Sequence, residues 1–148
     1  EGMTGSLDAA IDAGARAEEH ARRLDARDLV AGALLIQGYA LVHVDPERAA
    51  QGPFGTTIQH GFLTLGMATG LLWSVCTVEG FNVILNYGLN KVRFPAPLKV
   101  GARFRMRVEL AEVDELAGGA QAIYRLTYEV ADEPKPCCVA GLVFRYYS

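Results

Sequence analysis

Four β-prone runs fill the second half of the chain, and each is bounded by turn residues. Alternation such as Phe104-Met106-Val108-Leu110 is typical of a strand with one apolar face and one polar face. Gly118-Gly119 indicates a hairpin between the second run and the third, because glycine tolerates the positive φ angles of a tight turn. The pattern therefore predicts an antiparallel meander of four strands, at Phe81 to Phe94, Phe104 to Val113, Ala120 to Val130 and Cys138 to Tyr146.

Helical patterns precede these strands. Apolar residues recur at helical spacing from Thr57 to about Val78, which predicts a long central helix. Asp45 followed by Pro46 predicts the start of a short helix from Glu47 to Gln51, because Asp is a good N-cap and Pro suits the first helical position.

The order of the elements predicts the fold class. With helices first and strands afterwards, we expect an α+β fold in which an antiparallel sheet packs one face against the central helix. Extra N-terminal helices are expected over residues 7–24 and 26–37. The 148 residues contain no internal repeat and no linker, so a single domain over residues 1–148 is predicted.

Charge and composition argue against several classes of partner. Fourteen basic and seventeen acidic residues give a formal net charge of −3, without the block of Lys and Arg that a nucleic-acid partner requires. The apolar run near residues 66–78 is shorter than the roughly 20 residues of a membrane span, and the polar N-terminus does not have the pattern of a signal peptide. The three cysteines, an odd number, suit a reducing compartment. We therefore expect a cytoplasmic protein that binds neither nucleic acid nor membrane and needs no metal or cofactor.

Several motifs, in a fixed order, are similar to those of one known family. HVDPERA begins at His43, GPFGTTI follows at Gly52, and HGFLTL follows at His60. Matches continue downstream at residues 86–97, 100–101, 138–140 and 144–147. Together these segments span about residues 43–148 and resemble the MaoC-like hydratases, also called R-specific enoyl-CoA hydratases.

The resemblance implies a fold and a reaction. The fold is the hot-dog fold, in which an antiparallel sheet wraps around a long helix, usually in a homodimer whose sheets join. The reaction is the reversible addition of water across the double bond of a trans-2-enoyl thioester, so the expected partner is a small-molecule acyl thioester or ester. In this family an Asp and a His share the acid/base work, and a backbone N–H at the start of the central helix polarises the thioester carbonyl. The resemblance places the His at His43 and the N–H donor at Gly61.

The Asp of the family motif has no counterpart in this sequence. Gly38 occupies its position, or Tyr39 if one residue is missing, and the Asn-Pro of the motif is replaced by Ala40-Leu41. We therefore predict an enoyl-thioester hydratase scaffold whose acid/base pair is incomplete, with weak or no hydratase activity. Substrate contacts are expected around this gap and around the helix start, at Gly38, Tyr39, Leu41, Phe54, Gln59 and His60.

Other interpretations stay open for single residues. His43 can serve in the pocket, or it can simply hydrogen-bond the backbone. Tyr39 can contact a ligand, or its ring can fill the vacated site. Cys76 can act as a catalytic nucleophile, or it can fill core space as free cysteines usually do.

The departures from the family pattern suggest a second function. Gln59, Cys76 and Gly141-Leu142 differ from the residues that are common in the family at those places. Deliberate redesign of one pocket, or drift in a non-catalytic relative, leaves such a pattern. The alternative is therefore a repurposed hot-dog pocket that binds an apolar small molecule, or that carries out esterase-like acyl transfer at Cys76.

Overall fold

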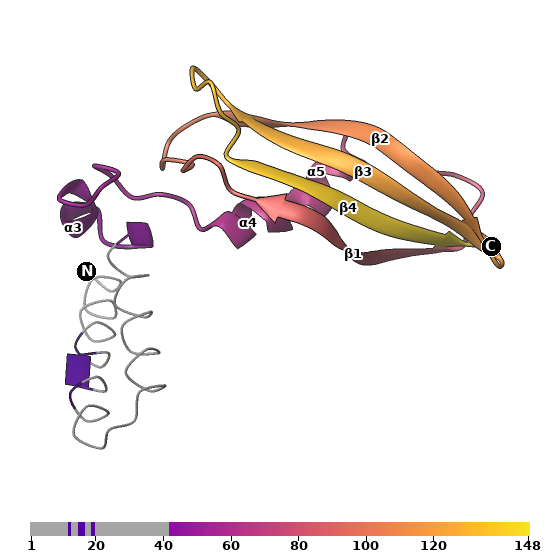
Figure 1. Ribbon diagram of the computed structural model, residues 1–148, viewed down its shortest axis with the longest axis horizontal. Helices are drawn as coiled ribbons and strands as arrows, with labels where there is room; N and C mark the ends of the chain where they lie inside the picture. Colours follow the sequence, from indigo (N-terminus) through magenta and orange to yellow (C-terminus); the bar gives the residue numbers. More distant parts are fainter. Residues whose placement is uncertain (1–11, 13–14, 17–18, 20–41) are drawn as a thin grey trace. The chain divides into compact units, whose positions relative to one another are not determined.

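The computed structural model describes residues 12, 15, 16, 19 and 42–148 (Figure 1). The chain forms two compact units, residues 1–58 and residues 59–148, and each unit is described by itself. The predicted N-terminal helices lie outside the described residues, apart from the four separate positions, which are helical and exposed. The single domain over residues 1–148 stays a prediction.

In the described part of the first unit, Val42 and His43 are helical, and the short helix α3 (Pro46–Ala50) follows. Asp45 is its N-cap, and the Asp45 carboxylate accepts a hydrogen bond of 3.0 Å from the backbone N–H of Arg48. The same carboxylate lies 3.4 Å from Nε of Arg48. The predicted helix start at Asp45-Pro46 is confirmed, because the cap satisfies a first-turn donor that has no partner inside the helix.

The central helix of the second unit consists of α4 (Gly61–Gly66) and α5 (Ala68–Trp73), with Met67 between them. The N–H of Met67 donates to the carbonyl of Thr64, three residues back, so the chain tightens at this point. No helix among the described residues combines the length and the hydropathy that a membrane span requires.

The helix predicted from Thr57 to Val78 is too long at both ends. At its start, the backbone N–H of Gln59 donates to the carbonyl of Leu98 at 2.7 Å, which holds the chain extended until the helix begins. At its end, the Ser74 hydroxyl donates to the carbonyl of Leu71 at 2.7 Å. A side-chain donor on that carbonyl competes with the backbone ladder, so the helix ends at Trp73.

Four antiparallel strands form one sheet: β1 (Val83–Arg93), β2 (Phe104–Leu116), β3 (Gly119–Val130) and β4 (Cys138–Tyr147). The positions of the four predicted strands and the hairpin at Gly118-Gly119 are confirmed. The order in the sheet is β1-β4-β3-β2. A simple meander is therefore wrong for β1, because the connection from β1 crosses to the far edge and β1 pairs with β4.

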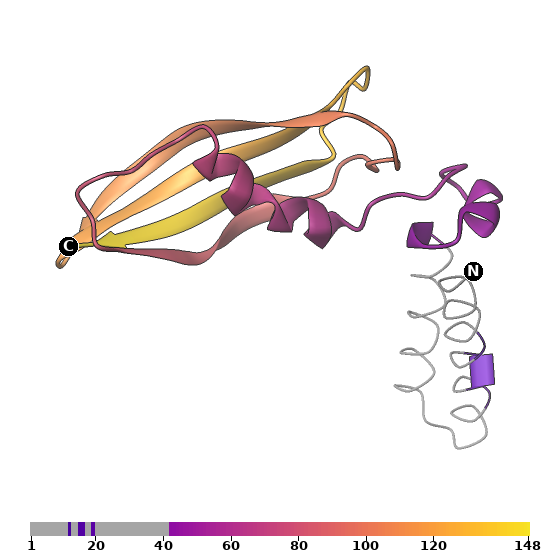
Figure 2. The same ribbon diagram turned by 180° about the vertical axis from the view of Figure 1, so that it is seen from behind.

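One face of the sheet packs against α4 and α5 (Figure 2). Along β3 and β4 the buried residues alternate with less buried ones, so every second side chain points toward the helices. The helices contribute Leu65, Ala68 and Leu72 to the core. The sheet contributes, among others, Tyr124, Leu126, Tyr128, Leu142, Phe144 and Tyr146. A sheet curved over a helix is the hot-dog fold that the resemblance implied, and this prediction is confirmed.

We predict that Leu72→Ala strongly destabilises the protein. Leu72 has no exposed surface, so truncation removes buried apolar area and leaves a cavity that costs about 2–5 kcal/mol of unfolding free energy. Leu63→Ala is the matched control, because Leu63 is 61% exposed and its truncation should cost less than about 1 kcal/mol. Urea denaturation of both variants measures the difference, and equal losses would contradict the assigned core.

Candidate functional site

His43 is held by the backbone of Ile58. The Nδ1 atom of His43 lies 2.7 Å from the carbonyl oxygen of Ile58, and the N–H of Ile58 donates to the carbonyl of Val42 at 3.1 Å. Because a carbonyl only accepts, Nδ1 carries the proton in this hydrogen bond. In the neutral imidazole Nε2 then has the lone pair, which is the form that accepts a proton from a substrate or from water.

Gly61 is the first residue of α4, and Phe94 lies against it. A Cβ atom at Gly61 would lie 2.8 Å from both Cδ1 and Cε1 of the Phe94 ring, closer than real Cβ atoms approach. A side chain at Gly61 therefore requires the Phe94 ring, which is 41% exposed, to shift away from the helix start. The N–H groups of a first helical turn have no acceptor inside the helix, so that of Gly61 is suited to meet a carbonyl oxygen.

Polar and aromatic neighbours order this helix start. The Gln59 side chain donates from Nε2 to Oγ1 of Thr64 at 3.1 Å, and Thr64 is buried. His60 is the N-cap residue, without a capping hydrogen bond from its side chain, and its ring stacks on Phe62 at a centroid distance of 6.0 Å. Phe62 in turn lies 5.9 Å from Phe94. These contacts order the helix start, and the substrate contacts expected of Gln59 and His60 stay predictions.

The predicted site residues fall in both units of the chain. His43 and Phe54 belong to the first unit, and Phe54 is exposed in the turn after α3. Gln59, His60, Gly61 and Cys76 belong to the second unit, in which the first three meet at the start of α4. Gly38, Tyr39 and Leu41 lie outside the described residues, as does the position that the missing Asp would occupy.

The contacts of Cys76 favour the packing interpretation. Its thiol packs against the core cluster, and Sγ lies 4.0 Å from the carbonyl oxygen of the adjacent Thr77. Tyr146, whose pKa is raised chiefly by burial and then by its hydrogen bond with Tyr124, also has its pKa raised by the nearby Cys76 thiol. A Cys nucleophile needs a positive or basic neighbour to form the thiolate. Esterase-like chemistry at Cys76 stays a prediction.

Three tyrosines line the face of the sheet that meets the helices. The hydroxyls of Tyr124 and Tyr146 are hydrogen-bonded to each other at 2.8 Å. The buried Tyr128 hydroxyl has no hydrogen-bond partner, and burial raises its pKa. Burial likewise raises the pKa of the Cys138 thiol to about 11. These side chains are buried and belong to the packed interior.

Two hollows of about 410 Å³ each open on the sheet of the second unit. One lies at the start of β2, around Arg103, Arg105 and Glu129. The other crosses all four strands and is lined by residues such as Asn90, Ile123 and Gly141. Neither hollow includes a predicted site residue. Among the residues that the structure describes, no three His, Cys, Asp or Glu side chains are grouped so that they could hold a metal ion.

Sequence reasoning missed Phe94 and Thr64 as parts of the site. Phe94 is in the matched run 86–97, directly before Pro95, but no local pattern says that its ring meets Gly61. Thr64 was counted within an apolar helix, and its polar side chain at a buried position was the available signal.

The fold and the site define a scaffold of the thioester dehydratase class. A model of the MaoC-like domain matches residues 14–132. The 3-hydroxyacyl-thioester dehydratase Z of Mycobacterium tuberculosis is 53% identical over 108 residues, which are 72% of each chain. Nodulation protein N of Rhizobium leguminosarum is 38% identical over 109 residues, which cover 71% of this chain and 67% of the relative. The chain belongs to the MaoC-like domain family.

Solved structures support the same fold. The (R)-hydratase from A. caviae involved in PHA biosynthesis aligns with a TM-score of 0.56 at 24% identity, over 77% of this chain and 81% of that one. A monoamine oxidase regulatory protein from Archaeoglobus aligns with a TM-score of 0.64 at 22% identity, over 78% of this chain and 76% of that one. These likenesses show a shared hot-dog fold.

We predict that Gly61→Ala destabilises the protein through the Phe94 ring. The added methyl group overlaps the ring, and overpacking of this kind costs about 1–3 kcal/mol. In a Phe94→Ala background the same substitution should cost less than about 0.5 kcal/mol, because its clash partner is gone. Thermal denaturation of the four proteins in this double-mutant cycle measures the coupling.

Gly66→Ala is the control for this cycle. Nothing lies within 4 Å of a Cβ atom at Gly66, so alanine should be neutral there or stabilising by up to about 1 kcal/mol. An equal cost of Gly61→Ala in both Phe94 backgrounds would show that the ring does not require the glycine.

Proposed function

We propose that the chain acts on acyl thioesters as a hydratase/dehydratase with an incomplete acid/base pair. The observation that carries the proposal is the His43–Ile58 hydrogen bond, which assigns a ring proton to Nδ1 and so makes Nε2 the nitrogen that exchanges a proton with the substrate. Membership of the MaoC-like family and the relative described as a 3-hydroxyacyl-thioester dehydratase support the substrate class.

The family resemblance assigns His43 and Gly61 different parts of the reaction. Nε2 of His43 takes a proton from water, the resulting hydroxide adds to C3 of the trans-2-enoyl thioester, and the negative charge moves onto the thioester oxygen. The Gly61 N–H donates to that oxygen as the charge develops. The protonated His43 then returns its proton to C2, so the sequence of steps consumes one water and regenerates the enzyme. The reverse sequence dehydrates a 3-hydroxyacyl thioester.

The missing carboxylate makes this chemistry slow. Where the family motif has an Asp, this sequence has Gly38 or Tyr39, so His43 must both activate water and deliver the proton. A second positioned acid/base group is worth about 10²- to 10⁴-fold in rate. We therefore infer weak activity, lower than that of a complete pair by about this factor.

We predict that Gly38→Asp raises the rate of crotonyl-CoA hydration by about 10²-fold or more, because it supplies the absent carboxylate. Loss of the ultraviolet absorbance of the conjugated enoyl thioester measures the rate. Tyr39→Asp tests the alternative alignment in the same assay. His43→Gln should abolish the activity of every variant, since it removes the proton acceptor.

Gly38→Asn is the matched control, because it has nearly the size of Asp without an ionised oxygen. It should leave the rate unchanged. The proposal fails if the starting protein and both Asp variants show no hydration, or if Asn accelerates the reaction as much as Asp.

We also infer that the chain forms a homodimer through the free edge of β1. Among the described residues, β1 pairs only with β4, and its exposed side chains include Val83, Leu85 and Tyr87. An exposed apolar edge strand readily adds another strand. Two antiparallel copies of β1 place the beginning of each strand beside Lys91 and Arg93 of the other.

We predict that replacing both Val83 and Leu85 by Lys dissociates this dimer, because four cations then meet at each end of the joined strands. Replacing both by Glu should preserve it, because Glu would face Lys91 and Arg93. Sedimentation equilibrium gives the masses. Equal behaviour of the Lys and Glu variants, or an unchanged dimer in both, would overturn the β1 interface.

A further inference from the structure

β2 forms the edge of the sheet opposite to β1. It is 13 residues long, and among the described residues only β3 pairs with it. Its second edge therefore presents backbone N–H and C=O groups that another strand can use. Edge strands of this length are usually protected from pairing by charges that repel an incoming strand.

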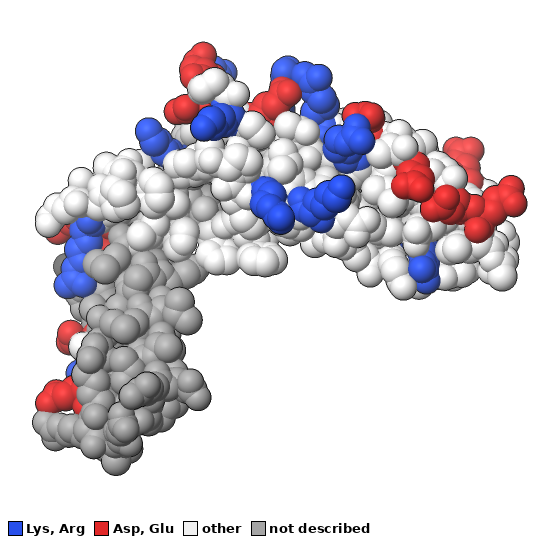
Figure 3. All heavy atoms as spheres, in the orientation of Figure 1, with Lys and Arg blue, Asp and Glu red and all other residues white. Residues whose placement is uncertain are grey.

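The charges on β2 are sorted along the strand. Arg105 and Arg107 lie in its first half, directly after Arg103. Glu109, Glu112, Asp114 and Glu115 lie in its second half. Figure 3 shows acidic side chains gathered at the right-hand end of the molecule, where β2 ends, and basic side chains over the middle. The strand thus has a positive end and a negative end.

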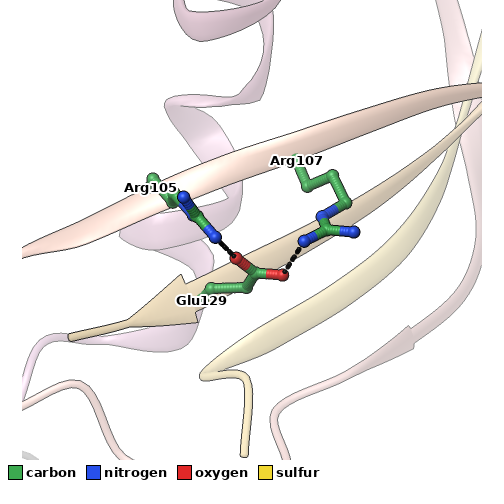
Figure 4. Close-up of polar contacts among 3 residues, drawn as sticks. All are labelled: Arg105, Arg107 and Glu129. Atoms are coloured by element: carbon green, nitrogen blue, oxygen red, sulfur yellow. Dashed lines mark hydrogen bonds and ion pairs between the residues drawn. The ribbon is translucent and has the colours of Figure 1, made fainter. Parts of the chain in front are cut away.

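The ion pairs that β2 forms with β3 do not neutralise the positive and negative ends of the strand. A single carboxylate, that of Glu129 on β3, lies between Arg105 at 2.7 Å and Arg107 at 3.0 Å (Figure 4). One negative charge therefore faces two positive charges, and the two arginines are 75% and 66% exposed. In the second half, Glu109 pairs with Arg125 at 2.8 Å.

Three further acidic side chains lie in the second half of β2. Glu112, Asp114 and Glu115 form no ion pair within the described residues. Among the described residues, the second half of the strand consequently carries an excess of negative charge that no ion pair offsets.

An apolar patch lies between the two charged halves. Leu110 and Val113 are each 57% exposed. Their partners on β3 are Tyr124 and Ala122, which are both buried and face the helices. Leu110 and Val113 therefore extend the apolar face of the sheet to its edge, where the described part of the chain leaves them exposed.

We propose that the free edge of β2 binds the same edge of a second copy of this chain, in antiparallel orientation about a two-fold axis. Antiparallel pairing puts the Arg105–Arg107 end of each copy beside the Glu112–Glu115 end of the other, so opposite charges meet twice. It also brings Leu110 and Val113 of both copies together near the axis. Parallel pairing would set like charges side by side.

The charge pattern distinguishes this interface from the one at β1. β1 carries Lys91 and Arg93 but no acidic residue, so its own charges cannot attract a second β1. The β1 interface and the β2 interface use opposite edges of the sheet, so one does not exclude the other. The register shift between Leu110 and Glu112 lies near the middle of β2 and leaves the two charged halves on either side. The β2 interface does not depend on thioester chemistry.

The test is a charge swap between two variants. Glu112→Lys with Asp114→Lys puts two Lys residues in the acidic half of β2, so that Arg105 and Arg107 of a second copy meet positive charge there. Arg105→Glu with Arg107→Glu and Glu129→Arg makes the edge acidic, and the third change keeps the ion pairs to β3 with their signs reversed. Sedimentation equilibrium measures self-association of each variant and of their equimolar mixture.

Each variant alone should lose the association step that uses β2, so that its association constant for that step falls at least tenfold. The equimolar mixture of the two variants should recover this step. In the wild type this step should weaken between about 50 mM and 1 M NaCl, because salt screens exposed charges. Glu79→Lys with Glu133→Lys is the matched control for the Glu112→Lys, Asp114→Lys variant; it makes the same change of net charge at exposed loop positions and should associate like the wild type.

Three results would overturn the proposal. The first is association of both swap variants as strong as that of the wild type. The second is failure of the mixture to recover the lost step while circular dichroism shows that both variants are folded. The third is slow amide exchange along the outer edge of β2 in a monomeric wild-type chain, which would show that another segment of the same chain covers the edge.

Discussion

Burial of the α4–α5 helix against one face of the sheet is the interaction on which the second unit depends. Leu72 and Leu65 on the helices meet aromatic side chains such as Phe144 on β4, and Trp73 packs on Phe144 with a centroid distance of 5.4 Å. A four-stranded sheet with one apolar face is not stable alone in water, so the helix must cover it. The strand order follows, because β3 and β4 carry the alternating buried residues and occupy the centre of the sheet.

The same packing sets up the helix start. The backbone of Gln59 is anchored on Leu98, its side chain reaches Thr64, and the Phe94 ring lies against Gly61. Each contact joins the start of α4 to a residue of the core or next to it. In the first unit, His43 obtains its tautomer from the carbonyl of Ile58, a backbone group that no side-chain substitution removes. The groups that would activate water and stabilise the oxyanion are therefore oriented by backbone hydrogen bonds and packing.

The two edges of the sheet differ in their physical character. β1 offers apolar side chains with cations at one end, whereas β2 offers a strand whose two ends have opposite charge. Glu129 is the counter-ion at the basic end of β2. Its hydrogen bond with Arg105 and the charge of Arg107 lower the pKa of its carboxyl group. The helices cover one face of the sheet, and among the described residues neither β1 nor β2 pairs with another strand along its outer edge.

By itself the sequence determined the strand positions, the Asp45 cap, the hairpin at Gly118-Gly119 and the similarity to the MaoC-like family. These features depend on alternation, capping and turn chemistry, which act between residues near each other in the chain. Only the tertiary structure decided that β1 lies beside β4, that the central helix begins at Gly61, and that Phe94 contacts this glycine. Such features depend on hydrogen bonds and contacts between residues distant in sequence, and no local pattern specifies which distant segment lies alongside.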